Sequence, residues 1–174
     1  MASVKTSADL GANVAITVTG LQELRKDLMA VEPKLNYKLN ARLKRVGNKV
    51  AGEARQMTGR LSEIQGDQTY TGRPSHLATQ AGDAMAGIGV KSGGGKGSVI
   101  KIIQDSRIGA IVEFAEVGHS PQGRAFVSML DRHFGQTGRF VWKAADANRE
   151  YVSSEILAVV RQTEAELNAK IGIA

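Results

Sequence analysis

The chain has 174 residues, enough for one domain that buries roughly 70% of the surface of its unfolded chain. It contains no cysteine, which excludes a disulfide framework, a thiolate metal site and a cysteine nucleophile. The net charge of +6 favours acidic partners. Residues 1–12 are small and polar, so we expect a flexible N-terminal arm without a signal peptide. No segment approaches the roughly 20 apolar residues of a membrane span, and we expect a protein made and kept in the cytoplasm.

The first half of the chain begins with a strand pattern and continues with a helical one. Residues 13–19 are short, β-branched and alternating, which predicts a strand with one buried face. From Leu21 to Met57, apolar residues recur at steps of three and four, as in a helix with one apolar stripe. Pro33 lacks a backbone donor and clashes with the preceding turn. We therefore predict a short helix up to about Ala30 and a longer one from Pro33 to Met57.

The middle of the chain indicates a loop followed by a hairpin. Residues 58–71 contain two glycines and many polar side chains and predict a long exposed loop. Residues 75–81 suggest a helical turn, and residues 84–91 and 98–104 predict two strands joined by a glycine-rich tip. The second of these strands has the highest β propensity in the chain. It should lie inside the sheet.

The last part of the chain is mainly helical. Residues 107–117 carry apolar side chains in a helical arrangement and predict a short helix, whereas residues 123–134 fit a strand or a helix equally well. Residues 135–138 form a turn signal, and residues 139–171 predict one long helix that Gly172 ends. The aromatic side chains here are expected to hold this helix against the sheet. They are Phe126, Phe134, Phe140, Trp142 and Tyr151.

The element order predicts an α+β fold in one domain over residues 13–172. A small antiparallel sheet should pack against two long helices and a short one, with long flexible loops between them. A small sheet has long edges in proportion to its area, and an exposed edge is a place where another subunit can add a strand.

The glycine-rich tip, residues 92–98, invites comparison with a phosphate-binding loop. That motif needs a glycine where Val90 stands and a Ser or Thr where Gly97 stands, so the spacing rejects it. A flexible hairpin tip is the simpler interpretation. In the functional alternative, Gly93, Gly94 and Gly95 form a mobile arm that orders on a neighbour or lines a channel.

No arrangement of polar residues predicts catalysis, a metal or a cofactor. The histidines at 76, 119 and 133 are widely separated, while metal ligands usually come at short spacings. No Gly-x-Ser-x-Gly turn is present. Glu113 and Glu116 are three residues apart and could pair two carboxylates, but a solvated or subunit-contacting face is the simpler reading. We expect no enzyme activity.

Most of the net charge falls between residues 21 and 57, where nine Lys and Arg face four Asp and Glu. The simpler interpretation is a solvated helix face whose long side chains cover apolar neighbours. The alternative is contact with DNA phosphates or with an acidic protein ring.

Four short motifs, in order, resemble the minor tail or tail-completion family of long-tailed bacteriophages. They are Gly20-Leu21-Gln22-Glu23-Leu24, Thr58-Gly59-Arg60-Leu61, Ala110-Ile111-Val112-Glu113-Phe114-Ala115 with Gly118, and Gly138-Arg139-Phe140-Val141-Trp142-Lys143-Ala144. With the strand before them and the helix after them, the resemblance covers roughly residues 13–170, and residues 73–85 look expanded relative to the family. The resemblance implies structural or interface roles for Thr58, Gly59, Glu113, Phe114, Arg139 and Phe140, and we add Arg60, Leu61 and Trp142 from the same motifs.

The resemblance also implies a place in the virion, at the head-tail junction of a siphophage. There, copies of the chain would form a ring of six between the connector and the tail tube. The expected partners are other copies, neighbouring neck, tail-terminator and tail-tube proteins, and passing duplex DNA. Two alternatives stay open: a tail-terminator ring at the end of the tail tube, and a small basic DNA-binding protein.

Overall fold

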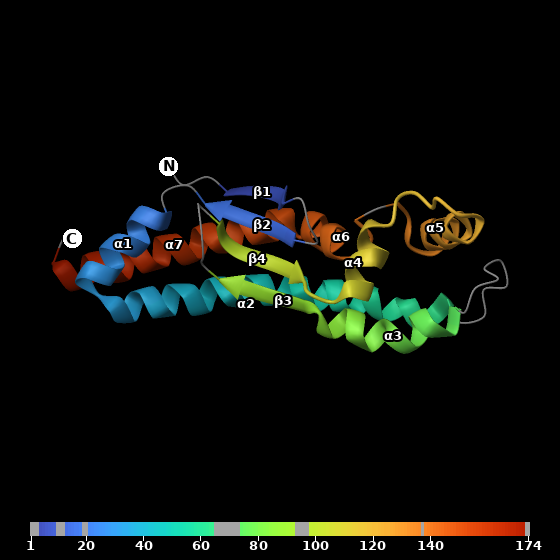
Figure 1. Cartoon of the computed structure of the whole chain (residues 1–174). Helices are drawn as coiled ribbons and strands as arrows, with labels where there is room; N and C mark the ends of the chain where they lie inside the picture. The colour runs from blue at the N-terminus through green and yellow to red at the C-terminus, as the bar shows by residue number, and fades with distance from the viewer. Residues whose placement is uncertain are drawn as a thin grey trace.

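A computed structural model describes residues 4–9, 13–18, 21–64, 74–92, 98–136 and 138–172, with side chains for 21–64, 80–91, 100–136 and 138–172. The elements in chain order are β1 (Val4–Asp9), β2 (Asn13–Val18), α1 (Leu21–Val31), α2 (Pro33–Gly59), the 3-10 helix η1 (Arg60–Ile64), α3 (Pro74–Ala86), β3 (Ile88–Ser92), β4 (Ser98–Gln104), α4 (Arg107–Phe114), α5 (Pro121–Phe134), α6 (Val141–Ala147) and α7 (Arg149–Ile171). They form an elongated α+β molecule, which confirms the predicted fold class (Figure 1).

The four described strands form one antiparallel sheet in the order β1-β2-β4-β3. β4 lies inside it, as its β propensity predicts. The expected flexible arm is wrong for Val4–Asp9, which pairs with β2 from Val4↔Val18 to Asp9↔Asn13. Its side chains are small and mostly polar, so the propensity signal for this strand is weak, and its pairing partner supplies the backbone hydrogen bonds.

Helices α1 and α2 follow the predicted break, because α1 ends at Val31 and Pro33 occupies the first turn of α2. α2 then crosses under the sheet. A Cβ atom on Gly47 would lie 2.7 Å from Ile100 and 2.9 Å from Val90, so the missing side chain lets the helix approach the strands closely. The predicted loop at 58–71 is wrong over its described part, since Thr58 and Gly59 continue α2 and η1 follows. Residues 65–71 lie outside the described residues.

Two further boundaries differ from the prediction. The strand predicted at 84–91 begins only at Ile88, because α3 extends to Ala86. The long helix predicted at 139–171 is split into α6 and α7 at Asn148, whose side-chain amide donates to the Ala144 carbonyl at 2.9 Å and also to Glu53 of α2. The ambiguous segment ending at Phe134 is helical. Gly172 ends α7 in the left-handed conformation, as predicted.

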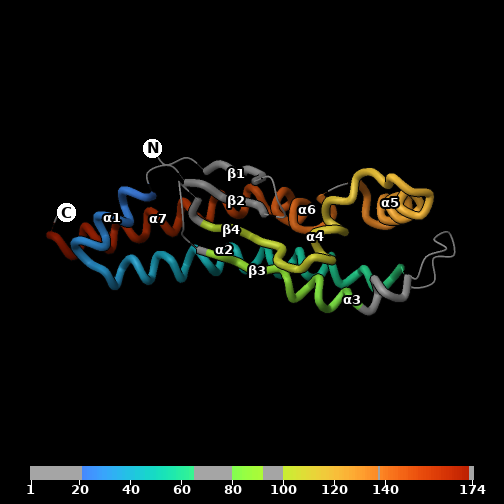
Figure 2. The backbone as a smooth tube through the Cα atoms, in the orientation of Figure 1, coloured from blue at the N-terminus to red at the C-terminus, as the bar shows by residue number. Residues whose placement is uncertain are grey.

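The buried side chains form two apolar clusters along the long axis of the molecule. The larger one joins α1, α2, β3, β4, α6 and α7. The smaller one joins η1, α3, α4, α5 and Phe140. α2 and α7 run side by side in opposite directions, while α3, α4 and α5 gather at the end away from both termini (Figures 1 and 2). The candidate site lies where α4 and α5 meet the start of α6.

Candidate interaction site

Glu113, near the end of α4, is 1% exposed and is hydrogen bonded to the start of another helix. Its carboxylate accepts the backbone N–H of Phe140 at 2.9 Å, of Val141 at 3.3 Å and of Trp142 at 3.2 Å. α6 begins here and has no capping side chain of its own. Glu113 therefore caps α6 from a distance in sequence, where a carboxylate also favours the helix dipole. Burial raises the pKa of Glu113 above its ordinary value of 4.5, although the three N–H donors oppose the shift.

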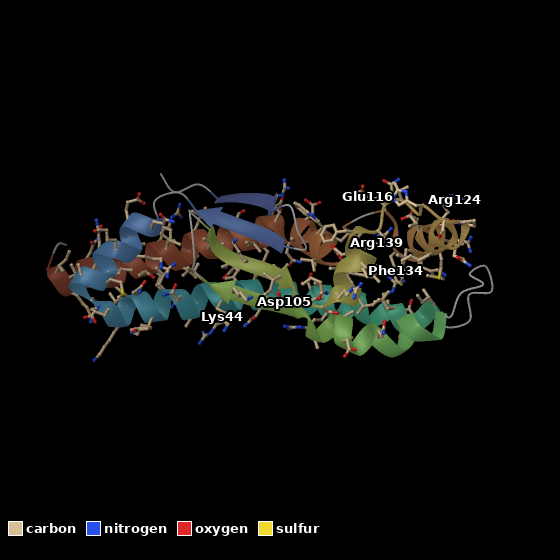
Figure 3. All side chains as sticks on the ribbon, viewed as in Figure 1. Lys44, Asp105, Glu116, Arg124, Phe134 and Arg139 are labelled. Atoms are coloured by element: carbon tan, nitrogen blue, oxygen red, sulfur yellow. The ribbon has the colours of Figure 1, made fainter. Side chains whose placement is uncertain are left out.

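Arg139, two residues before α6, makes the complementary contacts to the end of α4. Its guanidinium donates to the carbonyls of Val112 at 2.8 Å and Ala115 at 2.9 Å, and to the carboxylate of Asp131 on α5 at 2.6 Å. The Arg139 side chain is fully buried, whereas that of Asp131 is 41% exposed. Arg139 thus satisfies carbonyl groups that a helix end leaves without partners and ties α5 to them. Figure 3 shows it between α4 and α5.

Together Glu113 and Arg139 form a polar brace between α4, α5 and α6. A backbone hydrogen bond from Gly138 N–H to the Glu113 carbonyl, at 2.9 Å, adds to it. The Glu113 carboxylate is buried and its oxygens already accept backbone donors, so it is not positioned to exchange protons with a substrate. The brace fixes the position of α4 and of the segment that follows it.

The outward side of that segment carries exposed apolar side chains. Ile111 is 43% exposed, Phe114 37% and Val117 69%, and we call these three the α4 ridge. An open hollow of about 600 Å³ lies on one side of the ridge, lined among others by Phe114, Glu116 and Trp142. A second one of about 400 Å³ is lined by residues of α3 and α4 and reaches Ile111. Exposed apolar side chains next to open hollows are typical of a protein-binding surface.

The ridge is also held at its far end. A Cβ atom on Gly118 would come within 2.0 Å of the Gly123 carbonyl carbon, so the backbone after α4 touches the first turn of α5. Ser120 caps α5 by accepting the Gly123 N–H at 3.0 Å. Without a glycine at 118 this approach is impossible. The segment from Ala115 to Ser120 is therefore supported at both ends.

The other residues predicted to have structural or interface roles are mainly structural. Thr58 is buried and donates to the Ala54 carbonyl at 2.7 Å, Gly59 lies against Met85, and Leu61 belongs to the smaller core. Arg60 is exposed and pairs with Glu63 of its own turn. Gly93, Gly94 and Gly95 lie outside the described residues.

Residues of the third and fourth motifs divide between core and surface. Phe140 is buried and packs edge-on against Phe134, with ring centroids 5.3 Å apart, while Phe114 and Trp142 border the larger hollow. Glu113 and Glu116 do not pair, because the first is buried and the second exposed. The simpler interpretation given for this pair, a solvated or subunit-contacting face, is wrong for Glu113.

A second group of exposed apolar side chains lies away from the ridge and was not anticipated. Met29 and Val31 end α1, Tyr37 lies in the second turn of α2, and Ile171 ends α7. We call this group the helical tip. The three helix ends meet at the left of Figure 1, where Lys170 of α7 pairs with Glu32 between α1 and α2 at 2.5 Å. Tyr37, at 70% exposed, is the most exposed of the four.

The edge of the sheet at β3 is partly blocked against strand addition. Gly87 accepts the Asp105 N–H, so the next carbonyl, that of Ile88, points away from β4. Arg55 of α2 occupies this carbonyl with two N–H groups, at 2.5 and 3.1 Å. An added strand would have to displace Arg55.

The described residues contain no group of three or more His, Asp or Glu side chains placed to hold a metal ion. Nor does any described helix have the length and apolar character needed to cross a membrane. Comparison of the chain with protein-family models, with curated proteins and with solved structures finds no match.

Proposed function

We propose that this chain is a structural virion protein of the head-tail junction of a siphophage, where its copies form a ring of six that completes the tail and joins it to the connector. The observation that carries the proposal is the brace. Glu113 and Arg139 are bonded to backbone groups and hold the apolar α4 ridge at the surface. A rigid apolar ridge suits binding to another polypeptide.

The hydrogen bonds of the brace join two of the motifs that carry the sequence resemblance. Of the four motifs that resemble the phage family, the third contains Glu113 and the fourth contains Arg139. These two motifs are hydrogen bonded to each other in both directions. The contact between the two motifs fixes the shape of the ridge. A fixed apolar surface supports an assembly role for this segment.

The test is to remove the gene from the phage that encodes it and to supply the protein in trans. We expect filled heads and separate tails without the protein, and joined infectious particles with it. Electron microscopy of complemented particles would then place the protein either in the neck or at the tail-terminator ring. Normal yields of joined particles without the protein would overturn the proposal.

A second candidate, duplex DNA binding, is favoured by one observation. Lys34, Lys38, Lys44, Arg45 and Lys49 are exposed along α2. Neutralising about five phosphates predicts that affinity falls roughly 10²- to 10³-fold between about 50 and 200 mM salt. Fluorescence anisotropy with a duplex oligonucleotide measures this. Binding that is absent, or that does not change with salt, would end this candidate.

A further inference from the structure

The seven large apolar side chains that are strongly exposed in the described part of the chain fall into two groups. Four form the helical tip and three form the α4 ridge. The tip lies at the end of the long molecule that carries the C-terminus, and α4 lies in the other half (Figure 1). One copy therefore cannot bring the tip and the ridge together, so whatever covers either group comes from outside that copy.

Charge separates the two surfaces. Next to the tip, Lys34 and Lys38 are exposed, and the neighbouring acids Glu32 and Glu166 are already paired. Their partners, Lys170 and Arg42, lower the pKa of both carboxyls. These two carboxylates face four basic side chains, so the tip presents apolar side chains beside a surplus of positive charge.

The exposed charge within the ridge is acidic. Glu116 lies between Phe114 and Val117, is exposed, and lines the larger hollow. Asp146 and Lys143 also line this hollow, but Asp146 is paired with Arg149 at 3.3 Å, and the Lys143 ammonium group donates to the Phe134 carbonyl. Two tips placed face to face would oppose lysine to lysine, and two ridges would oppose carboxylate to carboxylate.

We propose that the helical tip of one copy docks on the α4 ridge of the next copy, with Val31 and Tyr37 against Phe114 and Val117 and with Lys34 and Lys38 near Glu116. This inference rests on the proposed function, because it names the partner of the same ridge. When two copies dock in this way, the pair still has one free tip and one free ridge. Copies therefore continue to add until the arrangement closes into a ring.

The test uses one variant for each surface and a matched control. Val31→Asp places a charge on the tip, Val117→Asp places one on the ridge, and Ala158→Asp places one on an exposed position of α7 that belongs to neither surface. All three positions are exposed, so the variants should fold, which circular dichroism checks. The mass of each purified protein is then measured by light scattering over a range of concentrations.

We expect wild type and Ala158→Asp to form assemblies larger than a pair, and each surface variant to require about tenfold or more protein to associate. Mixing the two surface variants should yield pairs and nothing larger, because each still offers the surface that the other lacks. The proposal is overturned if wild type stays monomeric, if only one variant loses association, or if the mixture forms no pairs.

The same variants separate this inference from the proposed function. In the complementation assay, Val31→Asp and Val117→Asp should each abolish joining of heads and tails, while Ala158→Asp supports it. Normal joining by both variants would overturn the docking inference and leave the neck function in place. A wild-type protein that docks as described in solution but is dispensable for joining would overturn the neck function and leave the docking inference in place.

Discussion

Glu113 stabilises the start of α6, and Arg139, which precedes α6, stabilises the end of α4, the helix that contains Glu113. The Glu113 carboxylate on α4 accepts three N–H groups at the start of α6, and the Arg139 guanidinium donates to two carbonyls at the end of α4. Removal of either side chain therefore leaves buried backbone groups without partners, and such groups are costly.

Glu113→Ala should lower the free energy of unfolding by about 2–4 kcal/mol. Three backbone N–H groups would lose their acceptor, and the buried Arg139 would lose a nearby negative charge. Urea denaturation followed by circular dichroism measures this. Glu116→Ala is the matched control, since Glu116 is exposed on the same segment, and it should change stability by less than about 0.5 kcal/mol. Equal effects of the two substitutions would contradict the brace.

Arg139→Lys should cost nearly as much as Arg139→Met, about 2–4 kcal/mol each, because one ammonium group cannot reach Val112, Ala115 and Asp131 from the positions of the guanidinium nitrogens. Asp131→Asn keeps an oxygen acceptor at a half-exposed position and should cost less than about 1 kcal/mol. A lysine that restores wild-type stability would show that charge alone suffices.

Stability should respond to pH through Glu113. Its pKa in the folded protein lies above the ordinary 4.5, so between these two values the folded state binds more protons than the unfolded state. The contribution of Glu113 to stability is then greatest at low pH and falls as pH rises through the folded pKa. The unfolding free energy of wild type relative to Glu113→Gln should decrease from pH 4 towards neutral pH. An increase of this difference from pH 4 to neutral pH would mean that folding lowers the pKa of Glu113.

Two glycines of α2 should respond in opposite directions to alanine. Gly47→Ala brings a methyl group against Ile100 and Val90 and should cost about 1–3 kcal/mol. Gly52 has nothing within 4 Å of the same position, so Gly52→Ala should stabilise by about 0.5–1 kcal/mol through helix propensity. Thermal unfolding of the two variants compares them directly. A stabilising Gly47→Ala would contradict the close packing of α2 against the sheet at this position.

Local patterns predict much of this fold. Pro33 separates α1 from α2, Gly172 ends α7, and the β-branched run from Ser98 places β4 inside the sheet, because each of these effects acts within a few residues. Non-local contacts explain the differences. Asn148 breaks the last helix where it also reaches Glu53 of α2, a residue 95 positions away.

The site was only partly predictable for the same reason. Spacing places Glu113 on a helix, but its burial depends on N–H groups 27 to 29 residues further along. The arrangement of apolar residues in 107–117 predicts a helix but does not indicate which of them are buried. In the structure Val112 faces the core, while Ile111 and Phe114 face outwards. A short helix packed on one side cannot bury all of them, and sequence alone does not indicate which side is covered.

Helix α2 contributes to both apolar clusters, and Met57 near its end packs against each of them. The two halves of the molecule therefore share one continuous backbone segment. A fluctuation that unfolds either half exposes part of α2, so the unfolding of one half is coupled to the unfolding of the other. Amide protons in the middle of α2 should accordingly exchange with solvent only through unfolding of the whole molecule, and more slowly than those of α3 or α5.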